Sequence, residues 1–324
     1  MKKYKIAIVG ATGAVGREML RCIFQFNFPF ESIKLLASAR SAGKIIEFEN
    51  KKFTVEELTE DSFKGIDVAF WSAGGSISEK YVPFAVKAGC INIDNTSHFR
   101  MDPNVPLVVP EVNGEALRKH KGIIANPNCT TIQMVSALNR LNEYFDIERI
   151  IVSTYQAVSG AGVAGMEELY RQSQEVLEGK EPVAKTLPCA SDKKHFPIAF
   201  NCIPQVDKFD LDNHFSKEEM KMVNETKKIF NKDIKVNATC VRVPVLRGHS
   251  ESVYIETKKP IDIDKVFELL NNSTGVELYD DLENQIYPMA NLFVGDELVH
   301  VGRVRKDLDN PNGLSLWVVA DQLM

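Results

Sequence analysis

Residues 5–16, with the sequence KIAIVGATGAVG, decide the fold of the N-terminal half of the chain. The apolar run that ends at Val9 predicts a buried strand, and glycines with the spacing G-x-x-G-x-x-G follow it at Gly10, Gly13 and Gly16. Such glycines let backbone N–H groups approach a pyrophosphate at the N-terminus of the next helix. The spacing alone also fits a plain tight turn, but its place between a first strand and a helix favours a dinucleotide-binding loop.

Short apolar runs alternate with longer amphipathic segments over the first 130 residues. Strands are expected at residues 5–9, 33–37, 68–72, 91–94, 107–109 and 122–125, with helices between several of them, as at residues 15–26 and 78–88. Strands and helices in alternation are typical of a parallel sheet covered on both faces. We therefore expect an α/β fold that begins with a Rossmann-type, parallel-sheet nucleotide domain over residues 1–128.

The second half of the chain has a different pattern. Helices are expected at residues 130–141 and 165–178, and a third follows Ser216, whose spacing from Glu219 is that of a capping box. Segments typical of strands, several of them alternating as in antiparallel sheets, lie at residues 150–158, 237–245, 252–257, 300–305 and 314–319. These features predict an α+β domain with a mixed, largely antiparallel sheet over residues 129–310, and then a C-terminal segment, residues 311–324.

The composition is that of an ordinary globular protein and argues against several classes of function. The 324 residues carry 39 Lys and Arg against 44 Asp and Glu, without any basic block, so no nucleic-acid partner is expected. No apolar run approaches the roughly 20 residues of a membrane helix, and the strand-like start leaves no room for a signal peptide. The six cysteines lie far apart without a Cys-x-x-Cys pair, which predicts neither disulfides nor a metal site and favours the cytoplasm.

The segment after the second expected strand indicates which dinucleotide is bound. NAD-binding loops place an acidic residue there for the ribose 2′-hydroxyl. Residues 37–44, ASARSAGK, contain no acid but include Arg40 and Ser41, whose guanidinium and hydroxyl suit a 2′-phosphate. We therefore expect NADP(H); a solvated loop with an incidental arginine is the alternative.

One cysteine and one histidine have the setting of a nucleophile and its partner. Cys129 follows Asn126-Pro127-Asn128 at the start of an expected helix, where the dipole and the N–H groups favour a thiolate and an oxyanion. His249 lies next to Gly248 in an expected turn, where an imidazole can face a pocket. Packing is the alternative for a cysteine, but a cysteine with a distant histidine is the expected pattern of a thiol nucleophile with an acid/base partner.

Charged and polar residues in apolar surroundings complete the candidate site. Gln156 follows the strand expected from residue 150, Arg100 follows a polar loop, and Glu218 and Lys221 share one face of the capped helix. Each of them alone is typical of a protein surface. Together with Arg242 they would supply two arginines, one lysine and one glutamate to bind a small substrate with several charges.

These residues carry a resemblance to a known family. The chain resembles the bacterial type of aspartate-β-semialdehyde dehydrogenase in segments that follow one another in the family's order: residues 10–16, 94–97, 99–102, 109–113, 126–131, 155–162, 218–221, 242–251 and 302–307. Agreement at so many separate points, spread over essentially the whole chain, is more specific than any single motif.

The resemblance implies a reaction and a set of roles. The reaction is the NADPH-dependent reductive dephosphorylation of L-aspartyl 4-phosphate to L-aspartate 4-semialdehyde, with release of phosphate, in lysine, threonine and methionine biosynthesis. Cys129 would form an acyl thioester, His249 would be the general acid/base, and Gln156 would orient the thiol and the reacting end of the substrate. A homodimer or homotetramer, built through the second domain, is also implied.

The resemblance also implies the binding residues. Arg242 would pair with the substrate α-carboxylate and Glu218 with its ammonium group, while Arg100, Asn128 and Lys221 would hold the phosphate. Contacts to NADP are implied for residues in both halves of the chain: Gly10, Thr12, Gly13, Ala14, Val15, Arg40, Ser41, Ser159, Gly160 and Gln322.

The chain departs from the family at its C-terminal end, and two alternatives stay open. The family usually continues beyond residue 324 into a helix that packs on the nucleotide domain, so we expect residues 311–324 to return toward that domain and Gln322 to be poorly anchored. The alternatives are another acyl-phosphate reductase, such as N-acetyl-glutamyl-phosphate reductase, and a catalytically silent NADP-binding paralogue. The residues around Cys129 favour the aspartyl substrate, and the presence of Cys129, His249 and Arg242 argues against a silent paralogue.

Overall fold

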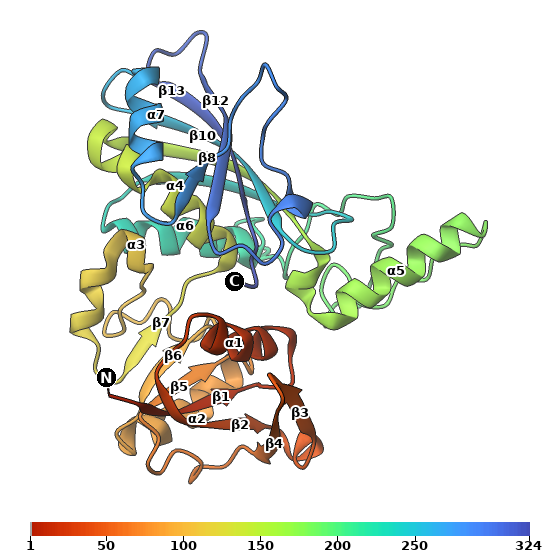
Figure 1. Cartoon of the computed structure of the whole chain (residues 1–324). Coiled ribbons are helices and arrows are strands. Elements are labelled where there is room, and N and C mark those ends of the chain that lie inside the picture. The colour runs from red at the N-terminus through yellow and green to blue at the C-terminus, as the bar shows by residue number, and fades with distance from the viewer. Residues whose placement is uncertain (1) are drawn as a thin grey trace. The chain divides into compact units, whose positions relative to one another are not determined.

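The computed structural model describes residues 2–324 (Figure 1). The chain forms two compact units, of which the first ends at Asn128 and the second begins at Cys129. The sequence analysis placed its first domain boundary at the same point. Each unit has its own sheet. Within the described part of the chain, no helix combines the length and the apolar character needed to cross a lipid bilayer.

The first unit contains a seven-stranded sheet with the order β3-β4-β2-β1-β5-β6-β7, in which all neighbours are parallel except the edge pair β3–β4. The expected Rossmann-type parallel sheet is therefore confirmed. The strands are β1 (Tyr4–Val9), β2 (Phe30–Ala37), β3 (Ile45–Phe48), β4 (Lys51–Glu57), β5 (Val68–Trp71), β6 (Ile91–Asp94) and β7 (Ile123–Ala125), and the longer helices are α1 (Ala14–Gln25) and α2 (Gly75–Lys87).

Side chains of β1 alternate between two separate cores. Ile6 and Ile8 belong to the cluster that contains residues of α1, whereas Ala7 and Val9 belong to the cluster that contains residues of α2. All four are fully buried. A strand covered on both faces buries apolar side chains at every position, which explains the uninterrupted apolar run before the glycine loop.

One expectation for this unit was wrong, and one pair of strands was not predicted. Residues 107–109 form no strand: Leu107 makes a single bridge to Ala125, because Pro106 and Pro110 lack N–H donors and Pro110 starts the short helix α3 (Pro110–Asn113). The hairpin of β3 and β4 was not predicted, since most of its residues are exposed and several are charged. Such strands carry little of the apolar periodicity on which sequence prediction depends.

The second unit contains a six-stranded sheet with the order β11-β12-β13-β10-β8-β9. The pairs β8–β9 and β11–β12 are parallel and the other three are antiparallel, so the expected mixed, largely antiparallel sheet is confirmed. The strands are β8 (Ile147–Gln156), β9 (Lys235–Arg242), β10 (His249–Thr257), β11 (Val276–Leu278), β12 (Val299–Lys306) and β13 (Gly313–Ala320).

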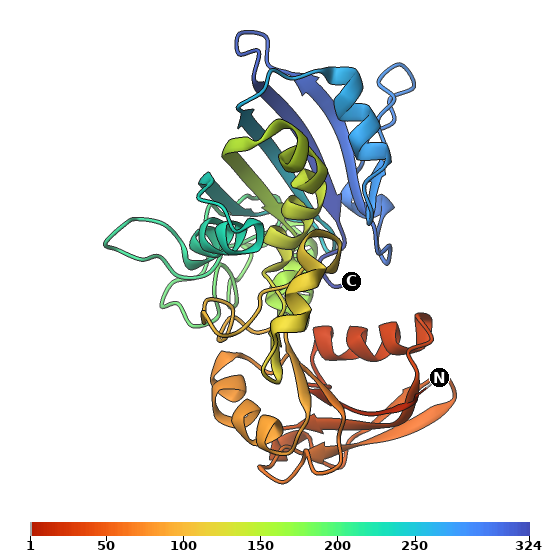
Figure 2. The same ribbon diagram turned by 90° about the vertical axis from the view of Figure 1, so that its left-hand side faces the viewer.

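Helices cover one face of this sheet. α4 (Cys129–Phe145), α6 (Lys217–Phe230) and α7 (Ile263–Asn271) pack on it, while α5 (Val163–Leu177) contacts the 3₁₀ turn η3 (Val158–Ala161) that precedes it (Figure 2). Along β8, Ile150 and Val152 are buried, whereas Ile151 and Tyr155 are 41% and 38% exposed. Since successive side chains of a strand point to opposite faces, the second face of the sheet is apolar in part and open.

In the C-terminal half, the predicted capping box is confirmed, two predictions are corrected, and two elements were not predicted. The capping box is present: Ser216 Oγ accepts the N–H of Glu219, and Glu219 Oε2 accepts the N–H of Ser216. Residues 311–324 are no separate segment, because β13 occupies an inner place between β12 and β10 and completes the core of the sheet. His249 begins strand β10 instead of lying in a turn, and α7 and β11 were not predicted.

A glycine substitution tests how closely α1 approaches the loop before it. A Cβ at Gly16 would lie 2.3 Å from the carbonyl oxygen of Gly10, so we expect Gly16→Ala to lower the free energy of unfolding by about 1–3 kcal/mol through overpacking. Gly114→Ala is the matched control, because nothing lies within 4 Å of its Cβ position and its φ is −50°. Chemical denaturation measures both variants, and equal effects would contradict the close approach.

Candidate active site

Cys129 is the first residue of α4. At this position the positive end of the helix dipole stabilises a negatively charged sulfur. Arg242 lies within electrostatic range of Cys129, and its positive charge favours the thiolate form. Cys90 and Cys240 contrast with it, because burial raises the pKa of Cys90 to about 12 and also raises that of Cys240.

The ends of three neighbouring strands bring other predicted site residues together. Strand β8 lies between β9 and β10. Gln156, the last residue of β8, pairs with Arg242, the last residue of β9, and Tyr155 pairs with Ser250, which follows His249 in β10. The register of the sheet therefore places Gln156, Arg242 and His249 at one end of it.

Gln156 belongs to a buried hydrogen-bond network. Its amide nitrogen donates to Glu218 Oε1 at 3.1 Å, and its amide oxygen accepts from Thr154 Oγ1 at 3.1 Å. Lys221 Nζ donates to Glu218 Oε2 at 2.9 Å and to Asp207 Oδ2 at 3.0 Å. Burial opposes the charge of Lys221, but the two carboxylates outweigh this effect and raise its pKa. The network holds one side-chain amide, one carboxylate and one cation in fixed positions.

Arg242 and His249 are both buried and both bind the backbone of Ala157. Arg242 Nη1 donates to the carbonyl oxygen of Ala157 at 2.7 Å, and the N–H of Ala157 donates to His249 Nδ1 at 3.0 Å. Burial lowers the pKa of Arg242, whereas Glu218 and Cys129 favour its charged form. Its Nε is buried and has no hydrogen-bond partner in residues 2–324, which leaves a donor for a ligand.

The imidazole of His249 is neutral at physiological pH. Burial and then the charge of Arg242 lower its pKa to about 3, against the opposing effect of Glu218. Gly160 borders the same groups: a Cβ there would lie 2.9 Å from Arg242 Nη1 and 3.5 Å from His249 Nε2. The glycine therefore keeps this side of both groups clear.

The last residues of the chain are tied into the second unit, which corrects the expected poor anchoring of Gln322. Its Oε1 accepts the N–H of Gly248 at 2.9 Å, and its Nε2 donates to Ser159 Oγ. The neighbouring Asp321 forms an ion pair with Arg247 at 2.7 Å. Gln322 and Ser159, both expected to contact the cofactor, are thus direct partners.

Arg100 and Asn128 lie in the first unit. Arg100 is buried, and its Nη2 donates to the carbonyl oxygen of Asn95 at 2.8 Å. Burial raises the pKa of Asp94, while hydrogen bonds and the charge of Arg100 oppose that shift. Asn128 is also buried and directly precedes the candidate nucleophile in the chain. The part of both residues in a phosphate site stays a prediction.

The loop between β1 and α1 fits a dinucleotide. Gly10 has a φ of +88°, and a Cβ there would lie 2.8 Å from the backbone of Ser72. Gly13 is the N-cap residue of α1; its backbone is extended, and it has no side chain that could occupy the N–H groups of the helix. No acidic residue lies in the first turn of α1. A helix N-terminus without acidic residues is suited to an anionic pyrophosphate. Residues 12–15, which include Thr12, Ala14 and Val15, are at least partly exposed.

Arg40 and Ser41, the residues expected to distinguish between the two nucleotides, directly follow the end of β2. The strand ends at Ala37, and Arg40 follows as an exposed side chain in the 3₁₀ turn η1 (Ala39–Ser41), with Ser41 buried beside it. The preference for a nucleotide with a 2′-phosphate that these residues imply stays a prediction.

Three parts of the site were not predicted. Asp207 lies in a loop-rich stretch without periodicity, so no sequence signal identifies it. Thr154 lies two residues before Gln156 on the same face of β8, and the period of two could have identified it. Ala157 contributes only backbone groups, so its residue type does not indicate its role. No group of three or more His, Cys, Asp or Glu within residues 2–324 is arranged to hold a metal ion.

Comparisons with known proteins identify the family of the chain. Two family models match the chain, "Semialdehyde dehydrogenase, NAD binding domain" over residues 5–120 and "Semialdehyde dehydrogenase, dimerisation domain" over residues 138–324. The aspartate-semialdehyde dehydrogenase of Bacillus subtilis is 53% identical over 321 residues, 98% of this chain and 92% of the relative. That of Campylobacter jejuni is 52% identical over 328 residues, 99% of this chain and 93% of the relative.

Solved structures give the same result. Aspartate semialdehyde dehydrogenase II from Vibrio cholerae superimposes with a TM-score of 0.93 at 47% identity, covering 99% of this chain and 94% of the other. A second structure of that enzyme, described as complexed with ASA, superimposes with a TM-score of 0.92 at the same identity and covers 100% and 94% of the two chains. The chain therefore belongs to the aspartate-semialdehyde dehydrogenase family.

Proposed function

We propose that the chain catalyses the NADPH-dependent reductive dephosphorylation of L-aspartyl 4-phosphate to L-aspartate 4-semialdehyde, as a step of amino-acid biosynthesis. The observation that carries the proposal is the position of Cys129 at the start of α4, within electrostatic range of Arg242. Arg242 and His249 both form hydrogen bonds with the backbone of Ala157. The names of the relatives support the aspartyl substrate over another acyl phosphate.

A thioester at Cys129 would divide the reaction into two steps. The sulfur displaces phosphate from the acyl carbon, and the thioester then presents that carbon for reduction. The nicotinamide, when bound, supplies the hydride. Gln156, held between Thr154 and Glu218, orients the reacting end of the substrate.

Fixed charges suit a substrate with a carboxylate, an ammonium group and a phosphate. Arg242 would pair with the α-carboxylate and Glu218 with the ammonium group. Lys221 would bind phosphate with the donor that its two carboxylate partners leave unused. Arg100 and Asn128 would complete the phosphate site. Charges held in place before the substrate arrives stabilise the transition state without reorganisation.

NADP(H) is the proposed cofactor. The family model supports an NAD-type nucleotide in the first unit. Arg40 and Ser41 after β2, in place of an acid, favour the form with a 2′-phosphate. Thr12, Gly13, Ala14 and Val15 would contact the pyrophosphate from the first unit. Ser159, Gly160 and Gln322 would contact the cofactor from the second.

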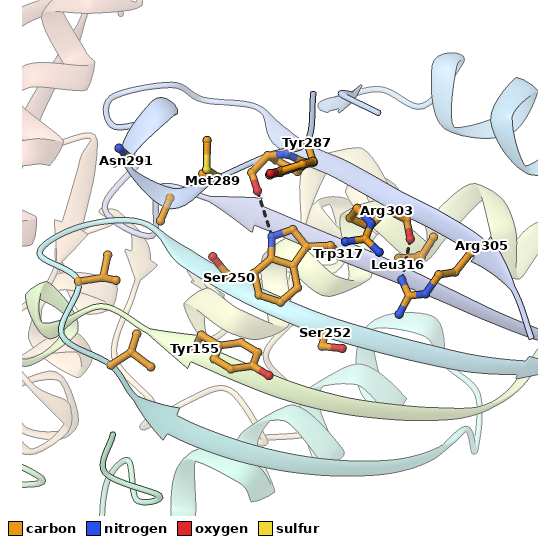
Figure 3. A pocket seen from close by; sticks show the side chains of 14 residues that line it. Tyr155, Ser250, Ser252, Tyr287, Met289, Asn291, Arg303, Arg305, Leu316 and Trp317 are labelled. Atoms are coloured by element: carbon orange, nitrogen blue, oxygen red, sulfur yellow. Dashed lines mark hydrogen bonds between the residues drawn. The ribbon is translucent and has the colours of Figure 1, made fainter. Parts of the chain in front are cut away.

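A homodimer formed through the open face of the second-unit sheet is the proposed assembly. Figure 3 shows the pocket on this face, lined by Tyr155, Ser250, Ser252 and Trp317 among others. With the exposed Ile151 they form a partly apolar surface of the kind that binds another protein. The model that matches residues 138–324 is named for dimerisation.

The proposed compartment is the cytoplasm. None of the six cysteines is in a disulfide, which fits a reducing compartment.

The first test concerns the nucleophile. Enzyme quenched with aspartyl phosphate in the absence of NADPH should carry an acyl adduct on the peptide that contains Cys129, detected by mass spectrometry. Cys129→Ala should abolish turnover and leave NADP binding unchanged, because the glycine loop is a separate element. Cys202→Ala, at an exposed cysteine, is the control and should keep full activity. An adduct on another cysteine would overturn the mechanism.

The second test concerns the cofactor. Arg40→Ala should raise the KM for NADP much more than the KM for NAD, because only NADP carries the 2′-phosphate. The expected loss is about 1.5–3 kcal/mol, typical of a hydrogen bond to a charged group. Steady-state kinetics with both cofactors measures it. Equal losses with the two cofactors would show that Arg40 does not select between them.

The third test concerns the assembly. Ile151→Asp places a charge on the open sheet face and should dissociate the dimer, because the carboxylate would be buried without a partner. Leu308→Asp is the control, since Leu308 is fully exposed in the turn between β12 and β13. Sedimentation velocity at micromolar concentration measures both variants and also separates dimer from tetramer. A wild-type monomer would refute the assembly.

A further inference from the structure

One buried glutamate has no part in the proposed mechanism. Glu251 lies in β10 and is fully buried. Its neighbours in the sheet are Thr154 of β8 and Val318 of β13, and neither side chain carries a charge. Burial raises the pKa of Glu251 well above its ordinary value, so the side chain is a neutral carboxylic acid near pH 7.

Gln133 of α4 is the hydrogen-bonding group that acts on this acid. Helix α4 packs on β10, and Gln133 is buried. Both oxygens of Glu251 and both polar atoms of the Gln133 side chain are buried, and within residues 2–324 none of the four has a partner in a third residue. Buried polar groups without partners are costly. A carboxylic acid and a primary amide each offer a donor and an acceptor, so the two side chains can satisfy one another.

The two residues repeat the relation between Cys129 and His249 one step further into the second unit. Gln133 follows Cys129 by four residues and lies on the same face of α4. Glu251 follows His249 by two residues and lies on the same face of β10. These steps cover about 6 Å along a helix and about 6.8 Å along a strand, so they match. Cys129 and His249 are themselves both within electrostatic range of Arg242.

We propose that Glu251 and Gln133 are positioning residues, whose contact fixes how far α4 is shifted along β10 and thereby places Cys129 relative to His249. The inference rests on the proposed function, in which Cys129 is the nucleophile. Apolar packing is non-directional and leaves a helix some freedom to slide on a sheet, whereas a pair of hydrogen bonds selects one register. Glu251 acts through α4 and touches neither substrate nor cofactor in this proposal.

The proton on Glu251 is part of this role. A carboxylate only accepts hydrogen bonds, so it would leave the amide oxygen of Gln133 facing a negative charge. That charge, one helical turn from Cys129, would also oppose the thiolate that the start of α4 favours. An amide in place of the acid keeps a donor and an acceptor, and a leucine keeps only the approximate size.

This difference gives the test. We expect Glu251→Gln to keep kcat, and the rate at which iodoacetamide alkylates Cys129, within about threefold of wild type, because both hydrogen bonds can form. Glu251→Leu should lower both quantities about 10–100-fold, the effect of a small displacement of a reacting group, and leave the KM for NADP unchanged. Steady-state kinetics and mass spectrometry of the peptide that contains Cys129 measure them. Glu143→Leu, at an exposed glutamate in the last turns of α4, is the control and should behave like wild type.

A double-mutant cycle shows whether the two residues act as a pair. The double variant Glu251→Leu/Gln133→Leu should lose no more than Glu251→Leu alone, because the second substitution removes a contact that is already broken. Additive losses would overturn the proposal. Lower thermal stability in the leucine variants with unchanged alkylation of Cys129 would show a structural role only and would also overturn it.

Two results do not depend on whether the leucine variants fold. The infrared difference spectrum between wild type and Glu251→Gln at pH 7 should contain the C=O band of a protonated carboxyl group, and a carboxylate band there would refute the proposal. A loss of tenfold or more in folded Glu251→Gln would refute it too. Alkylation of Cys129 needs no substrate, so it tests the positioning by itself. Wild type that fails to reduce NADP with aspartate semialdehyde and phosphate would overturn the proposed function instead.

Discussion

The two hydrogen bonds to Ala157 hold the candidate active site together. Its N–H orients His249 and its carbonyl orients Arg242, and Ala157 directly follows Gln156 at the end of β8. Ala157 follows the last residue of β8, a strand that is paired on both sides, and its backbone binds two polar side chains from β10 and β9. The positions of His249 and Arg242 therefore depend on the placement of this one residue.

Burial gives these groups their chemical character. In water, an imidazole titrates near neutrality and an arginine exchanges its partners freely. Inside the second unit, burial makes His249 neutral, and the charge of Arg242 is held against a burial penalty by Glu218 and Cys129. Most buried polar groups in folded proteins have partners. Within residues 2–324, Nε of Arg242 and Nε2 of His249 have no hydrogen-bond partner, which supports the proposal that the substrate binds beside them.

The network of Lys221, Glu218 and Gln156 connects two elements of the second unit. It joins α6 to the end of β8 through one carboxylate, with a loop residue, Asp207, as the outer partner of the lysine. Removing a partner from such a buried network leaves an uncompensated charge, which is costly. The network thus has a structural role, and it holds both signs of charge in the fixed positions that the proposed substrate site requires.

Local patterns were enough to predict much of this molecule. The apolar run and glycines of residues 5–16, the capping box at Ser216 and the cysteine at the start of α4 each depend on residues close in the sequence. The structure therefore agrees with them closely. The hairpin of β3 and β4, whose residues are exposed and often charged, lacks such a pattern and was missed.

The sequence by itself determined the residue types of the site and the family to which they belong, because motifs of a few residues carry that information. It could not determine how the side chains meet. That Gln156, Arg242 and His249 share one end of a sheet follows from the register of β8, β9 and β10, strands that are far apart in the chain. That Ala157 binds both His249 and Arg242 also follows from the folded chain alone, because its N–H donates to His249 Nδ1 and its carbonyl oxygen accepts from Arg242 Nη1.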